Sequence, residues 1–204
     1  MTALAQELDQ RLNSDYQYLM QRLSPEMREQ LRRSERAWIK FRDLDHTALR
    51  SSRETLGLSK SESDAFDIRG VANRINEFLV FAKGGASPAD SSEIERADAD
   101  LNSVYRKCIA SIGARHAAKL REAQRAWITF RDAHRGLGLD LWLSIIQHRT
   151  DQLREFYIEY PTANARENEL NDHWIVYLKE IQADKSYPNW TAPPYDLYLS
   201  NRTR

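Results

Sequence analysis

The chain has 204 residues, of which 41% are hydrophobic and 29% are charged, so it is long enough to bury a core in one or two domains. Its 30 Lys and Arg residues balance 30 Asp and Glu residues, which argues against a nucleic-acid binder that relies on a strongly basic domain. No apolar run approaches the roughly 18 residues of a membrane-spanning helix. The single cysteine, Cys108, excludes an intrachain disulfide and a cysteine-based zinc site.

Apolar residues recur at steps of three and four along most of the chain, and Gly and Pro are scarce, which predicts long amphipathic helices. Ser24-Pro25-Glu26 combines the N-cap, the proline and the acid that favour a helix start, and Ser92 with Glu95 fits a capping box. In chain order the expected helices are 3–23, 26–56, 60–82, 92–112, 114–135, 139–159 and 163–184. The tail after the last of them is rich in proline and aromatic residues, so we expect it to be extended.

The dominant feature of the sequence is an internal repeat. Residues 8–43 align without a gap with residues 97–132 at a constant offset of 89, and 14 of these 36 positions are identical. The densest part, Arg-Ala-Trp-Ile-x-Phe-Arg-Asp, occurs in both copies. A looser match between Arg74 and Arg149, at an offset of 75, extends the repeat to a third helix of each copy.

The repeat predicts an all-α fold of tandem duplicated three-helix modules, which form a helical bundle with an additional C-terminal helix and an extended aromatic tail. We expect the segments 8–56 and 97–135 to superpose as helical hairpins, because the gapless alignment includes the connection between the helices. The expected boundaries are a first, more divergent module at 1–83, a linker at 84–91, a second module at 92–160, and the C-terminal helix and tail at 161–204.

The repeated aromatic residues lie on the apolar side of each expected helix. Trp38 and Phe41 in the first module correspond to Trp127 and Phe130 in the second. A stacking platform for a ligand would use the same residue types, but the position on the seam favours packing in the core.

The repeated polar residues are interpreted as structural. An adjacent Arg and Asp on a helix point about 100° apart, so we expect each to pair with a neighbouring helix rather than with the other. Asparagines beside seam leucines are expected to be buried amides that bond a neighbouring helix. The residues concerned are Asn13, Arg42, Asp43, Asn102, Arg131 and Asp132.

One helix carries a basic stripe, defined by Arg28, Arg32, Arg36 and Lys40 at intervals of four. Like charges at this spacing cost about 0.2–0.5 kcal/mol per pair. Two interpretations remain open at this point. Acids on adjacent helices neutralise the stripe, or the stripe is a docking face for an acidic protein partner.

Two motifs of the second module occur in a characteristic order. Asp-Ala-Asp-Leu-Asn-Ser-Val-Tyr at 98–105 precedes Leu-Arg-Glu-Ala-Gln-Arg-Ala-Trp-Ile-Thr-Phe-Arg-Asp at 120–132. Together they resemble the lysozyme-inhibitor LprI-like N-terminal domain family, and the first module resembles a divergent copy with Glu35 in place of Gln124. The resemblance implies small helical bacterial domains that are exported to the cell envelope.

The resemblance also implies a function. It suggests a non-enzymatic binding protein that inhibits or sequesters a lysozyme-type peptidoglycan hydrolase in the periplasm or cell envelope, or gives immunity against such a toxin. A lysozyme cleft carries two catalytic carboxylates, which suit a basic docking face. The alternative is a structural or interaction module with a cytoplasmic protein partner. The histidines lack metal-ligand spacing and no phosphate-binding loop is found, so neither an enzyme, a metal nor a cofactor is expected.

Overall fold

The computed structural model describes residues 3–52, 60–82 and 90–155, with side chains from residue 5 in the first range and from residue 66 in the second. These residues form six α-helices and one short 3-10 turn, and they contain no strand, so the all-α fold is confirmed. The elements are α1 (Ala3–Arg22), α2 (Pro25–Ser52), α3 (Lys60–Ala82), α4 (Ser91–Ser111), α5 (Ala114–His134), the 3-10 turn η1 (Arg135–Leu137) and α6 (Leu139–Arg154). The helix expected at 163–184 and the aromatic tail lie outside the described residues.

Local sequence sets where the helices begin. As expected, α2 begins at Pro25, and the Ser24 hydroxyl accepts a hydrogen bond from the backbone N–H of Met27 at 3.3 Å. The capping box expected at Ser92 is wrong by two residues. Helix α4 begins one residue after Asp90, whose side chain caps the first turn while Glu93 bonds back to the Asp90 backbone N–H at 3.2 Å.

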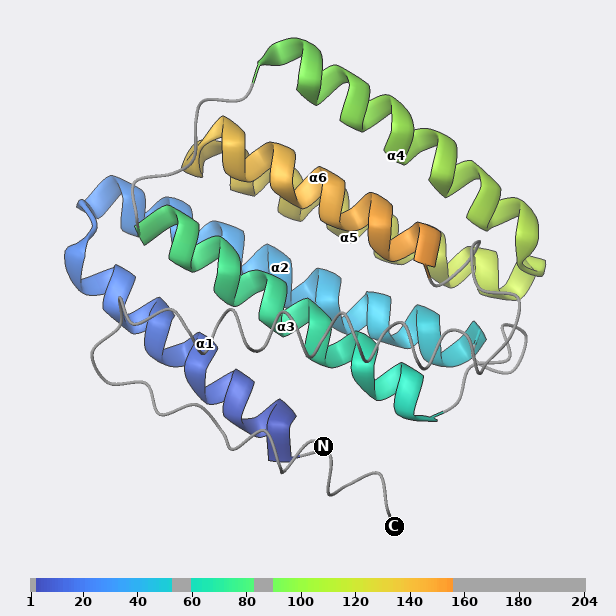
Figure 1. Ribbon diagram of the computed structural model, residues 1–204, viewed down its shortest axis with the longest axis horizontal. Coiled ribbons are helices and arrows are strands. Elements are labelled where there is room, and N and C mark those ends of the chain that lie inside the picture. The colour runs from blue at the N-terminus through green and yellow to red at the C-terminus, as the bar shows by residue number, and fades with distance from the viewer. Residues whose placement is uncertain (1–2, 53–59, 83–89, 156–204) are drawn as a thin grey trace.

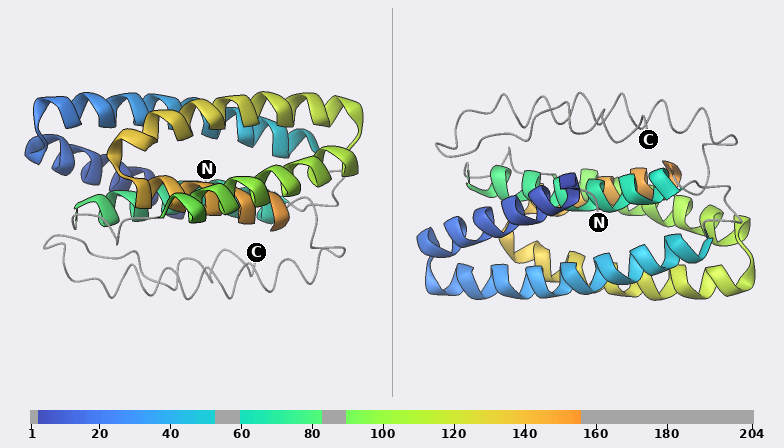
Figure 2. Two further views of the ribbon diagram at one scale, coloured as in Figure 1. Left: turned by 90° about the horizontal axis from the view of Figure 1, so that it is seen from above. Right: turned by 90° about the horizontal axis from the view of Figure 1, so that it is seen from below.

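The helices pack in two layers (Figures 1 and 2). Helices α2 and α5 form one layer, and α1, α3, α6 and α4 lie side by side in the other. Among the described helices the most extensive packing is between α2 and α5, which run antiparallel: Ser34 contacts His134, and Phe41, further along α2, stacks on the earlier Phe130.

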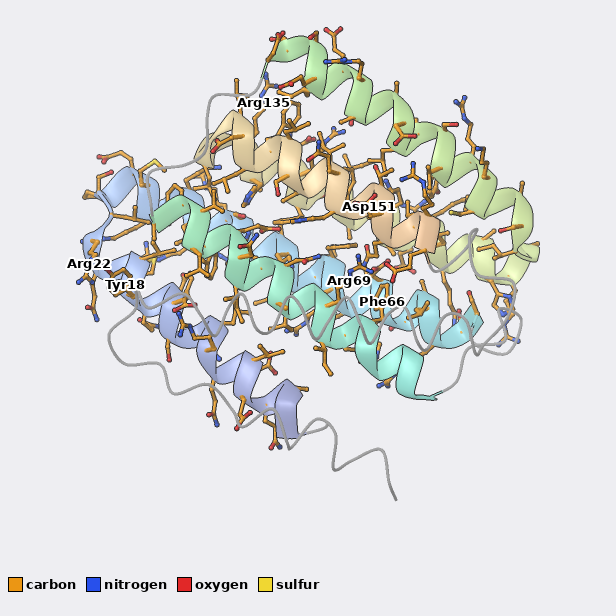
Figure 3. The ribbon with its side chains drawn as sticks, viewed as in Figure 1. Tyr18, Arg22, Phe66, Arg69, Arg135 and Asp151 are labelled. Carbon is orange, nitrogen blue, oxygen red and sulfur yellow. The ribbon has the colours of Figure 1, made fainter. Side chains whose placement is uncertain are left out.

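The two modules have the same internal arrangement. Helix α1 packs mainly on α3, and the equivalent helix α4 packs mainly on α6. Equivalent helices therefore occupy equivalent places about an approximate two-fold axis that passes between α2 and α5 (Figure 1). Across the second layer, Arg69 of α3, labelled in Figure 3, pairs with Glu155 directly after α6 and joins the modules a second time.

The core contains the repeated aromatic residues. Trp38 and Trp127 are 4% and 2% exposed, which matches the position expected for them on the apolar seam. Phe41 and Phe130 stack across the interface between the modules with their centroids 6.1 Å apart and their planes 4° from parallel. None of the described helices combines the length and apolar content that crossing a bilayer requires.

Candidate functional site

The basic stripe lies on the surface of α2. The side chains of Arg32 and Arg36 are 45% and 70% exposed, Lys40 is exposed, and Arg28 is half-buried. The stripe begins beside the turn that joins α1 to α2 and continues to the middle of α2. It therefore presents two guanidinium groups and one ammonium group to solvent on a rigid helix.

A carboxylate of α2 itself partly balances these charges. Glu29, half-exposed, lies 3.5 Å from Arg32, 3.4 Å from Arg33 and 3.7 Å from Arg36. Exposed pairs of this kind contribute about 0–1 kcal/mol and exchange readily with water. Within the described residues no acid of a neighbouring helix pairs with the stripe, so the interpretation that adjacent helices neutralise it is wrong there. Glu29 is thus shared by three arginines, so this face of α2 keeps a net positive charge.

The stripe is specific to the first module. At the equivalent positions of α5 only Arg121 and Arg125 are basic, and both are exposed. Ala117 replaces Arg28 and is buried, and Thr129 replaces Lys40. The scaffold is nearly symmetric, whereas this charge pattern is present on one side only.

The repeated Arg-Asp pairs differ from the expectation. Arg42 bonds the adjacent Asp43 at 3.0 Å, and Arg131 bonds the adjacent Asp132 at 2.9 Å, so the expectation that neighbours cannot pair is wrong. The long arginine side chain reaches around the helix to the short aspartate. Arg131 also bonds Asp98 of α4 at 3.2 Å, which is the kind of inter-helix pair that was expected.

The expectation of buried asparagine amides is also wrong. Asn13 and Asn102 are both exposed, and the Asn13 amide donates to the backbone carbonyl of Asp9 in its own helix at 2.9 Å. Each asparagine directly follows a seam leucine, so it points about 100° away from the core. These residues face solvent and do not connect helices.

A buried polar cluster around Arg74 was not predicted. The Arg74 side chain is fully buried and donates to Glu35 of α2 at 2.8 Å and to Glu77 of α3 at 2.7 Å. It also donates to the Ser34 hydroxyl at 3.1 Å and lies 3.2 Å from the His134 Nδ1 of α5. The cluster therefore connects α2, α3 and α5 at the centre of the molecule.

Burial and the neighbouring charges determine the protonation states of Glu77 and His134 in this cluster. Burial disfavours the charged form of Glu77, but the adjacent His148 and the Arg74 guanidinium outweigh this effect and lower the pKa of Glu77 to about 2. Burial and the nearby Arg74 lower the pKa of His134 to about 3. Because a guanidinium can only donate, the Nδ1 that faces Arg74 is the unprotonated nitrogen. The His134 ring is therefore neutral at physiological pH.

A second buried cluster surrounds Arg149 on α6. The Arg149 guanidinium donates to Gln124 of α5 at 3.1 Å, to Gln152 of α6 at 2.5 Å and to Asp45 of α2 at 2.9 Å. Burial raises the pKa of Asp45, although Arg149 and Gln152 act in the opposite direction. The match of Arg74 with Arg149 at the offset of 75 was the sequence signal for both clusters, but it did not indicate burial.

Possible metal ligands and the single cysteine are the other groups that could carry chemistry. The described residues contain no group of three or more His, Cys, Asp or Glu side chains that could hold a metal ion. Cys108 is buried, and burial raises the pKa of its thiol to about 11, so it is not an activated nucleophile. The features that stand out are the basic stripe on the surface and the two arginine clusters inside.

The sequence matches a known protein family over most of its length. The family of lysozyme inhibitor LprI matches residues 1–77 and 89–153, which include both modules. The chain belongs to the LprI family. The match in two segments agrees with two tandem copies of the family unit. The structure is also similar to the crystal structure of an uncharacterised protein from Burkholderia thailandensis, with a TM-score of 0.63, 22% identity, and coverage of 74% of this chain and 81% of that one. That likeness concerns the fold alone, and no curated protein matched the sequence.

Proposed function

We propose that this protein inhibits or sequesters a lysozyme-type peptidoglycan hydrolase in the cell envelope, and that it binds the enzyme through the basic stripe of α2. Membership of a lysozyme inhibitor family supports the activity. The exposed stripe supports the choice of this surface as the binding site. Within the described residues, the half-exposed Glu29 is the one acid that pairs with Arg32 and Arg36.

The mechanism is steric occlusion. A muramidase cleft carries two carboxylates that flank the scissile bond, so a guanidinium presented from a rigid helix complements it. Because the pairs with Glu29 are weak and exposed, exchanging them for partner carboxylates costs little. Charge complementarity of this kind mainly raises the association rate. The interaction should weaken as salt rises, since exposed charges are screened over about 8–10 Å at physiological ionic strength.

A charge reversal with a matched control tests the docking face. Arg32→Glu with Arg36→Glu should weaken inhibition of a muramidase at least tenfold and abolish its salt dependence. The same reversal at the repeat-equivalent Arg121 and Arg125 of α5, which are also exposed, should have a much smaller effect. Circular dichroism of both variants checks that the helices remain folded. Undiminished inhibition by the α2 variant, or equal losses in both variants, would rule out this docking face.

A further inference from the structure

The two buried arginine clusters are copies of one another. Arg74 and Arg149 are equivalent at the offset of 75, as are their neighbours one helical turn on, Glu77 and Gln152. On the first layer Glu35 and Gln124 are equivalent at the offset of 89. In both clusters the arginine bonds the residue one turn along its own helix and the side chain from the second helix of its own module.

Each arginine also reaches one position in the other module. Arg74 of the first module lies 3.2 Å from His134, and Arg149 of the second bonds Asp45 at 2.9 Å. Asp45 and His134 occupy the same repeat position, because they are 89 residues apart. The phenyl rings preceding them by one turn, Phe41 and Phe130, lie 5.0 and 5.3 Å from the same arginines, so both contacts across the interface repeat as well.

The geometry of the two clusters repeats, but the chemistry of their side chains differs, both within each module and at the exchanged position. Arg74 already has two carboxylates from its own module, and the other module supplies a neutral histidine. Arg149 has two amides from its own module, and the other module supplies its one carboxylate, from Asp45. Each of these two buried guanidinium groups therefore has at least one carboxylate partner, and neither has three.

Pairing of a module with a copy of itself would break this balance. Two first modules would surround each Arg74 with Glu35, Glu77 and the Asp45 of the other copy, which places three carboxylates in the core around one cation. Two second modules would leave each Arg149 with two amides and a histidine and no carboxylate. Both arrangements bury charge without compensation, which is costly in a protein interior.

We propose that the exchanged residues Asp45 and His134 make the α2–α5 surface specific for pairing between unlike modules. The partner that the buried face of α2 fits is therefore α5 of the second module, and not a second α2. The residues that are the same in both modules make the interface symmetric. The residues that differ, Asp45 and His134, favour pairing of a first module with a second module.

A substitution at His134 in the full chain tests the proposal. His134→Asp gives α5 the residue that α2 carries, and His134→Asn has the same shape without the charge. The melting temperatures of the two variants are compared in three backgrounds: the natural chain, Glu35→Gln, and Glu35→Gln with Glu77→Gln. The Glu35→Gln background keeps the 2.7 Å bond between Arg74 and Glu77. It can therefore still be compared with the natural chain if the background that lacks both carboxylates does not fold.

The negative charge of the Asp variant at position 134 should lower the melting temperature in the natural chain and raise it in the background without Glu35 and Glu77. In the natural chain the Asp variant should melt several degrees below the Asn variant, because Arg74 would face three carboxylates. The difference should shrink when Glu35 is neutral, and it should reverse when Glu77 is neutral too, because the new Asp is then the only carboxylate on Arg74, as Asp45 is on Arg149. A difference between Asp and Asn that stays the same in all backgrounds would overturn the proposal.

Discussion

Glu77→Gln should destabilise the fold in a way that depends on pH. The Glu77 side chain is 6% exposed and accepts a hydrogen bond from Arg74 at 2.7 Å, and its pKa in the folded protein is about 2 against an ordinary value of 4.5. Glutamine keeps the size of the side chain and removes the charge. Arg74 then retains Glu35, so the variant should still fold.

The size of the effect follows from the shift in pKa. A group whose pKa is lowered on folding stabilises the folded state above its unfolded pKa, and this contribution disappears as pH falls through the folded value. The shift of Glu77 from 4.5 to about 2 corresponds to about 3 kcal/mol at neutral pH. The difference between the natural chain and the variant should therefore be about 3 kcal/mol at pH 7 and narrow to about 1 kcal/mol at pH 3.

Urea unfolding followed by circular dichroism at several pH values from 7 to 3 measures this difference. Using a difference cancels the contributions of shared groups that do not interact with Glu77, such as Asp45, whose raised pKa acts in the opposite direction. Glu29→Gln, at a half-exposed position on α2, serves as the control and should change stability by less than about 1 kcal/mol. A loss for Glu77→Gln that is small, or that does not change between pH 7 and pH 3, would refute this account of the cluster.

Two further predictions concern the same core. Trp127→Ala should cost about 3–5 kcal/mol, as expected for a large buried aromatic residue, whereas alanine at the adjacent, 40% exposed Ile128 should change the thermal melting point little; similar effects of the two would place Trp127 outside the core. His134 has its pKa lowered to about 3, so the unfolded chain takes up a proton below pH 6.5 that the folded chain does not, and stability should fall as pH falls from 6.5 toward 3. His134→Asn should flatten this decline between pH 6.5 and pH 5 in urea titrations, and an unchanged slope would show that another group is responsible.

The repeat in the sequence predicts most of the architecture because helical periodicity and a constant offset are local properties. They place the described helices within a few residues and put Trp38 and Trp127 in the core. The clusters around Arg74 and Arg149 were not predicted, because they depend on contacts between residues far apart in the chain, such as the bond from Arg149 to Asp45 across 104 positions. Sequence spacing shows that two arginines are equivalent, but only the packing of α3 and α6 against the first layer shows that they are buried.

The candidate docking face illustrates the same distinction. The spacing of the stripe predicts a row of cations on α2, but exposure depends on which side of α2 faces α5 and the second layer. Glu29 lies three to seven residues from Arg32 and Arg36 on the same helix, and the structure shows that it contacts both. Acids of adjacent helices were the partners expected by analogy with mixed surface charge. On α3, which packs on α2, the buried acid Glu77 pairs with Arg74 instead.

The central claim is that the protein inhibits a lysozyme-type hydrolase, and titration of muramidase turnover with the purified protein tests it most directly. Peptidoglycan hydrolysis is followed at low and at physiological salt while the concentration of the folded protein is raised. The account predicts that turnover falls to zero at saturation, and that more protein is needed at the higher salt. Full turnover at saturating concentrations of folded protein, at both salt concentrations and with several muramidases, would contradict it.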